Sequence, residues 1–173
     1  MQLLAEMEAM AVTVAMALMV AAMAVAKPTS QFDPNTFMGS TLFAANFANS
    51  KVPPTSIKGK KFIEVSFANS SFELSNFSNV AFQKTNFSRA SLKGSAFYKS
   101  TLNNINFSQA DLRGVHFTYI NFKDVDFSNA TLNGARFEFC TFENVTFTAA
   151  KLNDVSCEAC KFLKNQNRPK ELR

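Results

Sequence analysis

The sequence predicts an all-β fold in which one domain is wound as a four-sided solenoid, after a hydrophobic helical segment at the N-terminus. Large apolar residues recur every five positions through most of the chain, and short motifs recur every twenty. The length of 173 residues, with 47% hydrophobic and 18% charged residues, fits one soluble domain with its own core. A chain that bends after every five residues and closes after four such units satisfies both periods.

The five-residue register can be followed from Phe32 to Phe162. Of its 27 central positions, 18 are Phe, six are Leu and the others are Val52, Ile57 and Cys157, so none is polar. In the last twenty repeats, the residue two positions before the centre is small or β-branched, and none is charged. A period of five matches neither the 3.6 residues of a helix nor the 2 of a strand, so the chain must bend once per unit.

The twenty-residue echo indicates four sides per coil. The motifs "ASLKG", "ADLRG", "ATLNG" and "AKLND" begin at Ala90, Ala110, Ala130 and Ala150. Asn, Asp, Ser or Thr usually precedes the central residue, where such side chains satisfy backbone groups at a corner. The centres and the residues two before them should therefore point inward. The predicted core includes Phe67, Phe87, Leu92, Phe107, Leu112, Phe127, Leu132 and Phe147.

The repeat resembles the pentapeptide-repeat family, whose consensus is A-[DN]-L-x-x. "ADLRG" and "ANFAN" meet this consensus closely, and "TNFSR" and "INFSQ" are Phe-rich forms of it. The resemblance implies a right-handed quadrilateral parallel β-helix. We divide the chain into a signal-peptide-like or anchor segment (1–26), a linker (27–31), the repeat solenoid (32–162) and a basic tail (163–173).

The N-terminal segment is typical of an export signal. Residues 9–26 carry no charge, and the Ala-Val-Ala sequence at 24–26 fits a small-residue cleavage site. This apolar stretch barely reaches the length of a spanning helix, which favours a removed signal over an anchor. The leading region holds two glutamates and no basic residue, so an anchor, a wrongly assigned start and an incomplete transit sequence stay open as alternatives.

Cleavage of this segment would place the protein in the periplasm, outside the cell or in an organelle lumen. Without cleavage we expect a membrane-tethered or cytoplasmic protein, with the membrane contacted only through the N-terminal segment.

Two parts of the chain depart from the regular repeat. "NSKVPPTSIKGKKF" contains Pro53 and Pro54 but keeps the phase. Because proline has no donor for a coil-to-coil ladder, we interpret it as a first coil with a bulging corner, or as a short excursion that preserves the phase. For the basic tail, a solvated end that covers the last coil is favoured over a binding role.

Catalysis needs converging polar groups, and the predicted interior has none. His116 is the single histidine and is expected to face solvent beside Phe117, where a structural or neutral role is favoured. The sequence shows no Ser, His and acid set, no glycine-rich phosphate loop and no paired-carboxylate cleft. We therefore predict no enzyme activity, no catalytic or metal-binding residue and no cofactor.

The cysteines allow a sharper hypothesis. Cys157 and Cys160 form a C-x-x-C motif, but both fall on inward positions, which favours small apolar packing in the last coil. No second cysteine pair completes a zinc site. Cys140 lies twenty residues before Cys160, so the two should stack in one column, near the upper end of disulfide reach. Export to an oxidising compartment would make a Cys140–Cys160 disulfide possible.

The expected role is that of a rigid protein-binding or scaffold module. Some pentapeptide-repeat proteins carry an acidic face that resembles duplex DNA and bind DNA gyrase, so a cytosolic modulator of a type II topoisomerase is the alternative. From Lys58 to Phe162 the chain has 12 basic and nine acidic residues, a net charge of +3, which disfavours that alternative.

Direct nucleic-acid binding is not expected either, because the basic residues are dispersed over several faces. A monomer is favoured over a dimer, since the chain lacks the longer C-terminal extension by which many dimeric members of the family pair.

One side of the predicted coil carries aromatic residues outside the core register. Tyr98, His116, Tyr119 and Phe139 all fall on the side that contains Phe117, and Tyr119 and Phe139 share a column. An exposed aromatic patch on a polar rod is a candidate protein-contact surface. The alternative is that the two stacked rings merely cover each other at a corner.

Overall fold

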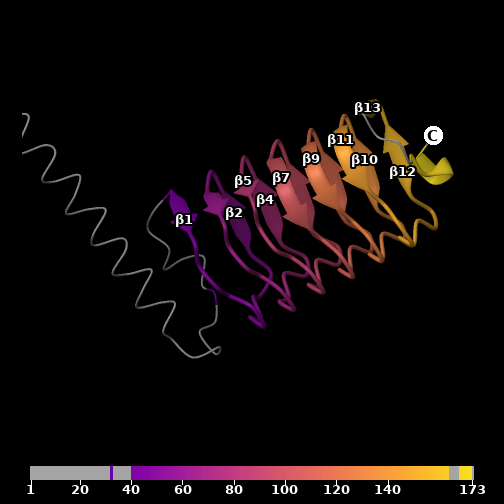
Figure 1. Cartoon of the computed structure of the whole chain (residues 1–173). Coiled ribbons are helices and arrows are strands. Elements are labelled where there is room, and N and C mark those ends of the chain that lie inside the picture. Colours follow the sequence, from indigo (N-terminus) through magenta and orange to yellow (C-terminus); the bar gives the residue numbers. More distant parts are fainter. Residues whose placement is uncertain (1–31, 33–39, 164–167, 173) are drawn as a thin grey trace, which may run out of the picture.

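The computed structural model describes residues 32, 40–163 and 168–172, and it shows a parallel β-solenoid of about six turns (Figure 1). One sheet contains β1 (Thr41–Phe43), β3 (Lys61–Ile63), β5 (Ala81–Gln83), β7 (Thr101–Asn106), β9 (Asn121–Asp126), β11 (Thr141–Thr146) and β13 (Lys161–Leu163). The other contains β2 (Ser56–Lys58), β4 (Asn76–Ser78), β6 (Ala96–Tyr98), β8 (His116–Thr118), β10 (Arg136–Glu138) and β12 (Ser156–Glu158).

A 3₁₀ helix, η1 (Lys170–Leu172), lies at the C-terminal end of the solenoid, next to β12 (Figure 1). The predicted N-terminal helical segment and linker lie outside the described residues. No helix in the described part of the chain is long and apolar enough to cross a membrane.

Every strand pairs in parallel with the strand one coil away, at an offset of twenty residues. Phe97, for example, pairs with Phe117, which pairs with Phe137. On the other two sides, isolated bridges of the same offset join the coils, such as Ser66 to Asn86 on one side and Ser91 to Asp111 on the other. The longer strands β7, β9 and β11 extend onto the first of these two sides. The prediction of four sides per coil is therefore confirmed.

The solenoid axis is filled by the central residues of the register. All eight predicted core residues named above are buried, with relative exposures from 0% to 8%. Like rings stack from coil to coil: the Phe107 ring centroid lies 5.3 Å from that of Phe87 and 5.2 Å from that of Phe127, with nearly parallel planes. Rings on neighbouring sides meet edge to face, as Phe117 does with Phe122. This alternation is the arrangement that aromatic quadrupoles favour.

Corner chemistry follows the expected residue types. The Oδ1 atom of Asn106 accepts a hydrogen bond of 2.8 Å from the backbone N–H of Ser108, and Asp126 does the same for Ser128. The next residue takes a left-handed conformation, for example Gln109 with φ of 60°. Such conformations suit Gly, Asn and Asp and are unfavourable for other side chains.

The proline-containing stretch forms a coil that stays in phase. Lys51 bridges to Ser71, and β2 pairs with β4, both at the regular offset. Pro53 and Pro54 are exposed at the corner between them. Because the φ angle of proline is fixed near −65°, this corner cannot adopt the left-handed turn of the later coils. Of the two interpretations, the first coil with an irregular corner is the one observed.

Phe32 fills the axis at the N-terminal end of the described solenoid. Its ring contacts Phe47 at 4.9 Å and Phe67 at 5.3 Å between centroids, and only 3% of the residue is exposed. The first coil has smaller central residues, among them Val52 and Ile57, so it leaves axial space that a phenyl ring can occupy.

The C-terminal end is covered by residues 168–172. Leu172 is completely buried against the core. Arg168 donates hydrogen bonds to the Leu172 carbonyl oxygen and places its guanidinium carbon 4.1 Å from the Phe162 ring centroid. In this part of the tail the chain covers the last coil, as the favoured interpretation predicts.

The core stack gives a direct stability prediction. Replacing Phe107 by Ala should lower the free energy of unfolding by about 3–5 kcal/mol, because it opens a cavity among rings that cannot close the gap. Phe43→Ala is the matched control, since half of Phe43 is exposed outside the core register, and it should change this free energy by less than about 0.5 kcal/mol. Chemical denaturation of both variants measures the difference, and equal losses would contradict the packing described.

Candidate protein-contact surface

Three exposed aromatic residues and one lysine form a continuous cluster where the strands of the second sheet end. The Tyr119 and Phe139 rings stack with centroids 4.9 Å apart and planes 12° apart. Tyr98 meets Tyr119 edge to face at 6.0 Å. The exposed fractions of the three residues are 40%, 48% and 48% in chain order, so their rings cover one another only in part. We call Tyr98, Lys99, Tyr119 and Phe139 the aromatic cluster.

Lys99 was missed by the sequence analysis. Its Nζ atom lies 5.1 Å from the Tyr98 ring centroid and 6.0 Å from that of Tyr119, within the range of cation–π attraction. The signal that could have found it is the twenty-residue column, since residues 99, 119 and 139 occupy equivalent corners of successive coils. Lys99 was missed because only aromatic residues were considered at these corners.

The backbone at this column is unfavourable for large side chains. Lys99, Tyr119 and Phe139 have φ angles of 47°, 56° and 52°, in the left-handed region. One coil earlier, the same column holds Asn79, a residue type that suits this region. Placing an aromatic ring at such a corner costs about 1 kcal/mol, of which ring stacking recovers part. Local folding preferences therefore do not explain these two residues.

His116 lies on the predicted side of the coil but apart from the cluster. It is exposed on β8, between Ala96 and Arg136 of the neighbouring coils. Within the described residues, no ring contact or cation–π contact joins it to the aromatic cluster. The structure thus brings together three of the four predicted contact residues.

The cluster has a polarity along the solenoid axis. Lys99 supplies positive charge on its N-terminal side. Glu138 precedes Phe139, and Glu158 follows one coil later in register with Glu138. Neither carboxylate forms an ion pair with any residue that the structure describes. The surface therefore offers an apolar stack with a cation at one end and two acids at the other.

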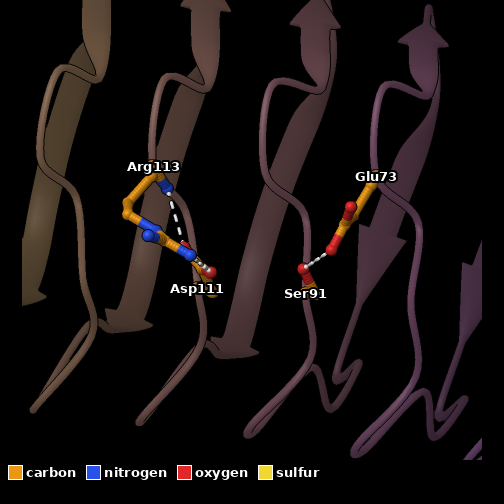
Figure 2. Close-up of polar contacts among 4 residues, drawn as sticks. All are labelled: Glu73, Ser91, Asp111 and Arg113. Carbon is orange, nitrogen blue, oxygen red and sulfur yellow. Dashed lines mark hydrogen bonds and ion pairs between the residues drawn. The ribbon is translucent and has the colours of Figure 1, made fainter.

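Another side of the solenoid carries small polar networks (Figure 2). Arg113 donates to both carboxylate oxygens of Asp111, and these hydrogen bonds are the main reason that the pKa of Asp111 is lowered. Ser91 donates a 2.7 Å hydrogen bond to Glu73. Glu73, Lys93 and Arg113 follow one another in a single column, which therefore contains charges of both signs. This side has no continuous acidic stripe.

The cysteines lie in the last two coils, and all three are free thiols. Cys140 is buried, whereas Cys157 and Cys160 are half-buried at inward positions. In the described parts of the chain, no group of three or more His, Cys, Asp or Glu side chains is placed to hold a metal ion.

Comparison with known families agrees with this architecture. A family model described as a pentapeptide repeat region matches residues 95–166, and one for pentapeptide repeats in eight copies matches residues 61–94. The chain belongs to the pentapeptide-repeat family. A search of curated proteins found no match.

Solved pentapeptide-repeat structures show partial similarity to this one. A protein from the thylakoid lumen of Arabidopsis thaliana is 28% identical, with a TM-score of 0.41, over 56% of this chain and 60% of that one. HetL from the cyanobacterium Nostoc, involved in heterocyst differentiation regulation, is 12% identical, with a TM-score of 0.45, over 67% of this chain and 63% of HetL. Full-length QnrB1, a plasmid-mediated fluoroquinolone resistance protein, is 15% identical, with a TM-score of 0.35, over 78% of this chain and 89% of QnrB1.

The strained corners of this pentapeptide-repeat protein lead to a second stability prediction. The double variant Tyr119→Asn and Phe139→Asn should have a free energy of unfolding within about 1 kcal/mol of wild type, because relief of backbone strain offsets the lost ring stacking. Thermal and chemical denaturation measure this change. A loss as large as that expected for Phe107→Ala would show that the two rings serve stability, which is the covering role left open above.

Proposed function

We propose that this pentapeptide-repeat protein is a non-enzymatic, rigid binding module that holds another protein against its aromatic cluster. The main evidence for this surface is that Tyr119 and Phe139 are half-exposed, stacked and placed at corners whose backbone conformation disfavours large side chains. Left-handed corners recur along the described solenoid, Leu74 among them, so the feature that distinguishes this corner is the stacking of two half-exposed rings in one column. A non-enzymatic role agrees with the generally non-catalytic character of the family.

The distribution of exposed apolar residues supports this surface over the others. In the described chain, the large hydrophobic residues that are exposed are Phe43, Leu74, Tyr98, Tyr119, Phe139 and Leu163. Three of these six belong to the aromatic cluster, in which the Tyr119 ring contacts the rings of both Tyr98 and Phe139. Scattered single apolar residues are ordinary on a protein surface, whereas a contiguous aromatic group marks a contact site.

The chemistry of the cluster indicates the kind of segment that it would bind. An apolar or aromatic side chain of the partner can pack on the exposed faces of Tyr119 and Phe139. A basic group beside that side chain would meet Glu138 and Glu158, and an acidic group would meet Lys99. Aromatic residues are enriched at the centre of protein interfaces, and polar and charged groups lie at the rim.

The experiment is affinity capture from cells that produce the protein, with partners quantified by mass spectrometry. We expect a partner that binds wild type and is reduced at least about tenfold by Tyr119→Asn combined with Phe139→Asn, as for loss of interface anchors. Leu74→Asn is the matched control, because Leu74 is 64% exposed at a corner with φ of 56° on another side. It should leave capture unchanged. Unchanged capture by the double variant would refute the proposed surface.

We further propose that the protein is exported, on the basis of the apolar segment and the small-residue pattern at 24–26. Intact mass and the N-terminal peptide of the native protein from fractionated cells test this directly. We expect a chain that begins at Lys27 outside the cytoplasm. Retention of Met1 in a cytosolic fraction would refute export and return the topoisomerase alternative to consideration.

A further inference from the structure

The three cysteines of the chain meet at the C-terminal end of the solenoid. Cys160 lies twenty residues after Cys140, at the equivalent place of the next coil, and three residues after Cys157 in its own coil. Cys140 is only 1% exposed, one coil below, whereas Cys160 lies in the last coil and is reachable from solvent. A buried thiol, Cys140, therefore lies next to a thiol that solvent can reach, Cys160.

Cys140 and Cys160 occupy equivalent places in successive coils. The Cys140 Sγ atom donates to the Phe117 carbonyl at 3.3 Å, and the Cys160 Sγ atom donates to the Phe137 carbonyl at 3.6 Å. A backbone hydrogen bond of 2.8 Å from Lys161 to Cys140 fixes the two coils in register. Neighbouring parallel strands lie about 4.8 Å apart, a Cα separation within the range of disulfides.

The surroundings of Cys160 favour its thiolate. The neighbouring Cys140 and Cys157 thiols, together with the positive charge of Arg168, lower the pKa of Cys160 against the opposing effect of burial. Cys160 in turn raises the pKa of the Cys140 thiol and of the Cys157 thiol, and burial adds to both effects. Arg168 is itself held in place by the Phe162 ring and the Leu172 carbonyl. Thiolates stabilised in this way are the reactive ones.

We propose that Cys160 is a redox-reactive thiol that exchanges with a small-molecule disulfide and is resolved by Cys140, which joins the last two coils covalently. In the first step the Cys160 thiolate attacks one sulfur of the oxidant, here glutathione disulfide. A Cys160–glutathione bond forms, the oxidant's own S–S bond breaks, and one glutathione thiolate leaves.

In the second step Cys140 gives its proton to solvent, and its thiolate attacks the Cys160 sulfur. The mixed disulfide breaks, the second glutathione leaves as a thiolate that takes up a proton, and the Cys140–Cys160 bond remains. Two protein thiols lose two electrons in total, and one glutathione disulfide becomes two glutathione thiols.

Placement favours Cys140 over Cys157 as the resolving thiol. Disulfide exchange proceeds in line, so the attacking sulfur must approach from the side opposite the leaving group. Cys140 lies one coil below Cys160 in the same column, so its sulfur approaches along the solenoid axis, and Cys160 is only half-buried, which leaves glutathione a way to solvent. Cys157 lies in the same coil, beside Cys160. From there, an in-line approach would direct the leaving group across the coil and not along the solenoid axis. The product would fasten the last coil to the one below it.

The test is oxidation of the full-length reduced protein with glutathione disulfide, followed by acid quenching, alkylation and peptide mapping. Wild type and Cys157→Ser should each yield the Cys140–Cys160 cross-link. Cys140→Ser should stop at a Cys160–glutathione adduct, and Cys160→Ser should keep its thiols free. Serine is a suitable replacement because Ser100 already occupies the same column.

Two further measurements, thiol alkylation and amide hydrogen exchange, use the wild-type protein alone. In native wild type, brief iodoacetamide treatment should modify Cys160 before Cys157 and Cys140. After oxidation, the Lys161 amide should exchange with deuterium about tenfold more slowly, because the covalent bond opposes opening of the last coil. Unreacted thiols, a Cys157–Cys160 cross-link, or equal alkylation of Cys157 and Cys160 would each overturn the assignment.

Discussion

The structure depends on the stacking of each side chain on its equivalent one coil away, imposed by parallel backbone hydrogen bonds at an offset of twenty residues. Because the offset is constant, each column of the solenoid is a line of spatial neighbours. Inside, this places phenyl rings at stacking distance along the axis. Outside, it places surface residues twenty positions apart in contact, so a binding surface is set by which residue types occupy one column.

The aromatic cluster and the cysteine site both use this property. Tyr119 stacks on Phe139 for the same geometric reason that Phe107 stacks on Phe127, although the first pair faces solvent. Cys160 lies above Cys140 in a column that holds Val80, Ser100 and Ile120 in the three preceding coils. In both places the fold supplies the proximity, and the chemistry comes from the residues placed there. The two sites lie close along the chain, since Phe139 directly precedes Cys140.

Most of the fold was predictable because the five-residue and twenty-residue periods are strong and unbroken. The buried centres, the polar corners and the column shared by Tyr119 and Phe139 follow from position alone. Contacts that depend on long side chains did not follow, such as Lys99 over Tyr98 and Arg168 over Phe162. The five-residue register also did not predict where the Phe32 ring lies. Its ring packs against the rings of Phe47 and Phe67, which come later in the chain.

A partner protein that covers the aromatic cluster would shield the backbone beneath it from solvent. The most direct measurement is amide hydrogen exchange of the captured complex compared with the free protein. We expect slower exchange in the complex for peptides that contain Tyr98, Tyr119 and Phe139, and unchanged exchange for the peptide around Leu74. Protection of the Leu74 side, or of no part of the solenoid near Tyr119, would contradict the claim.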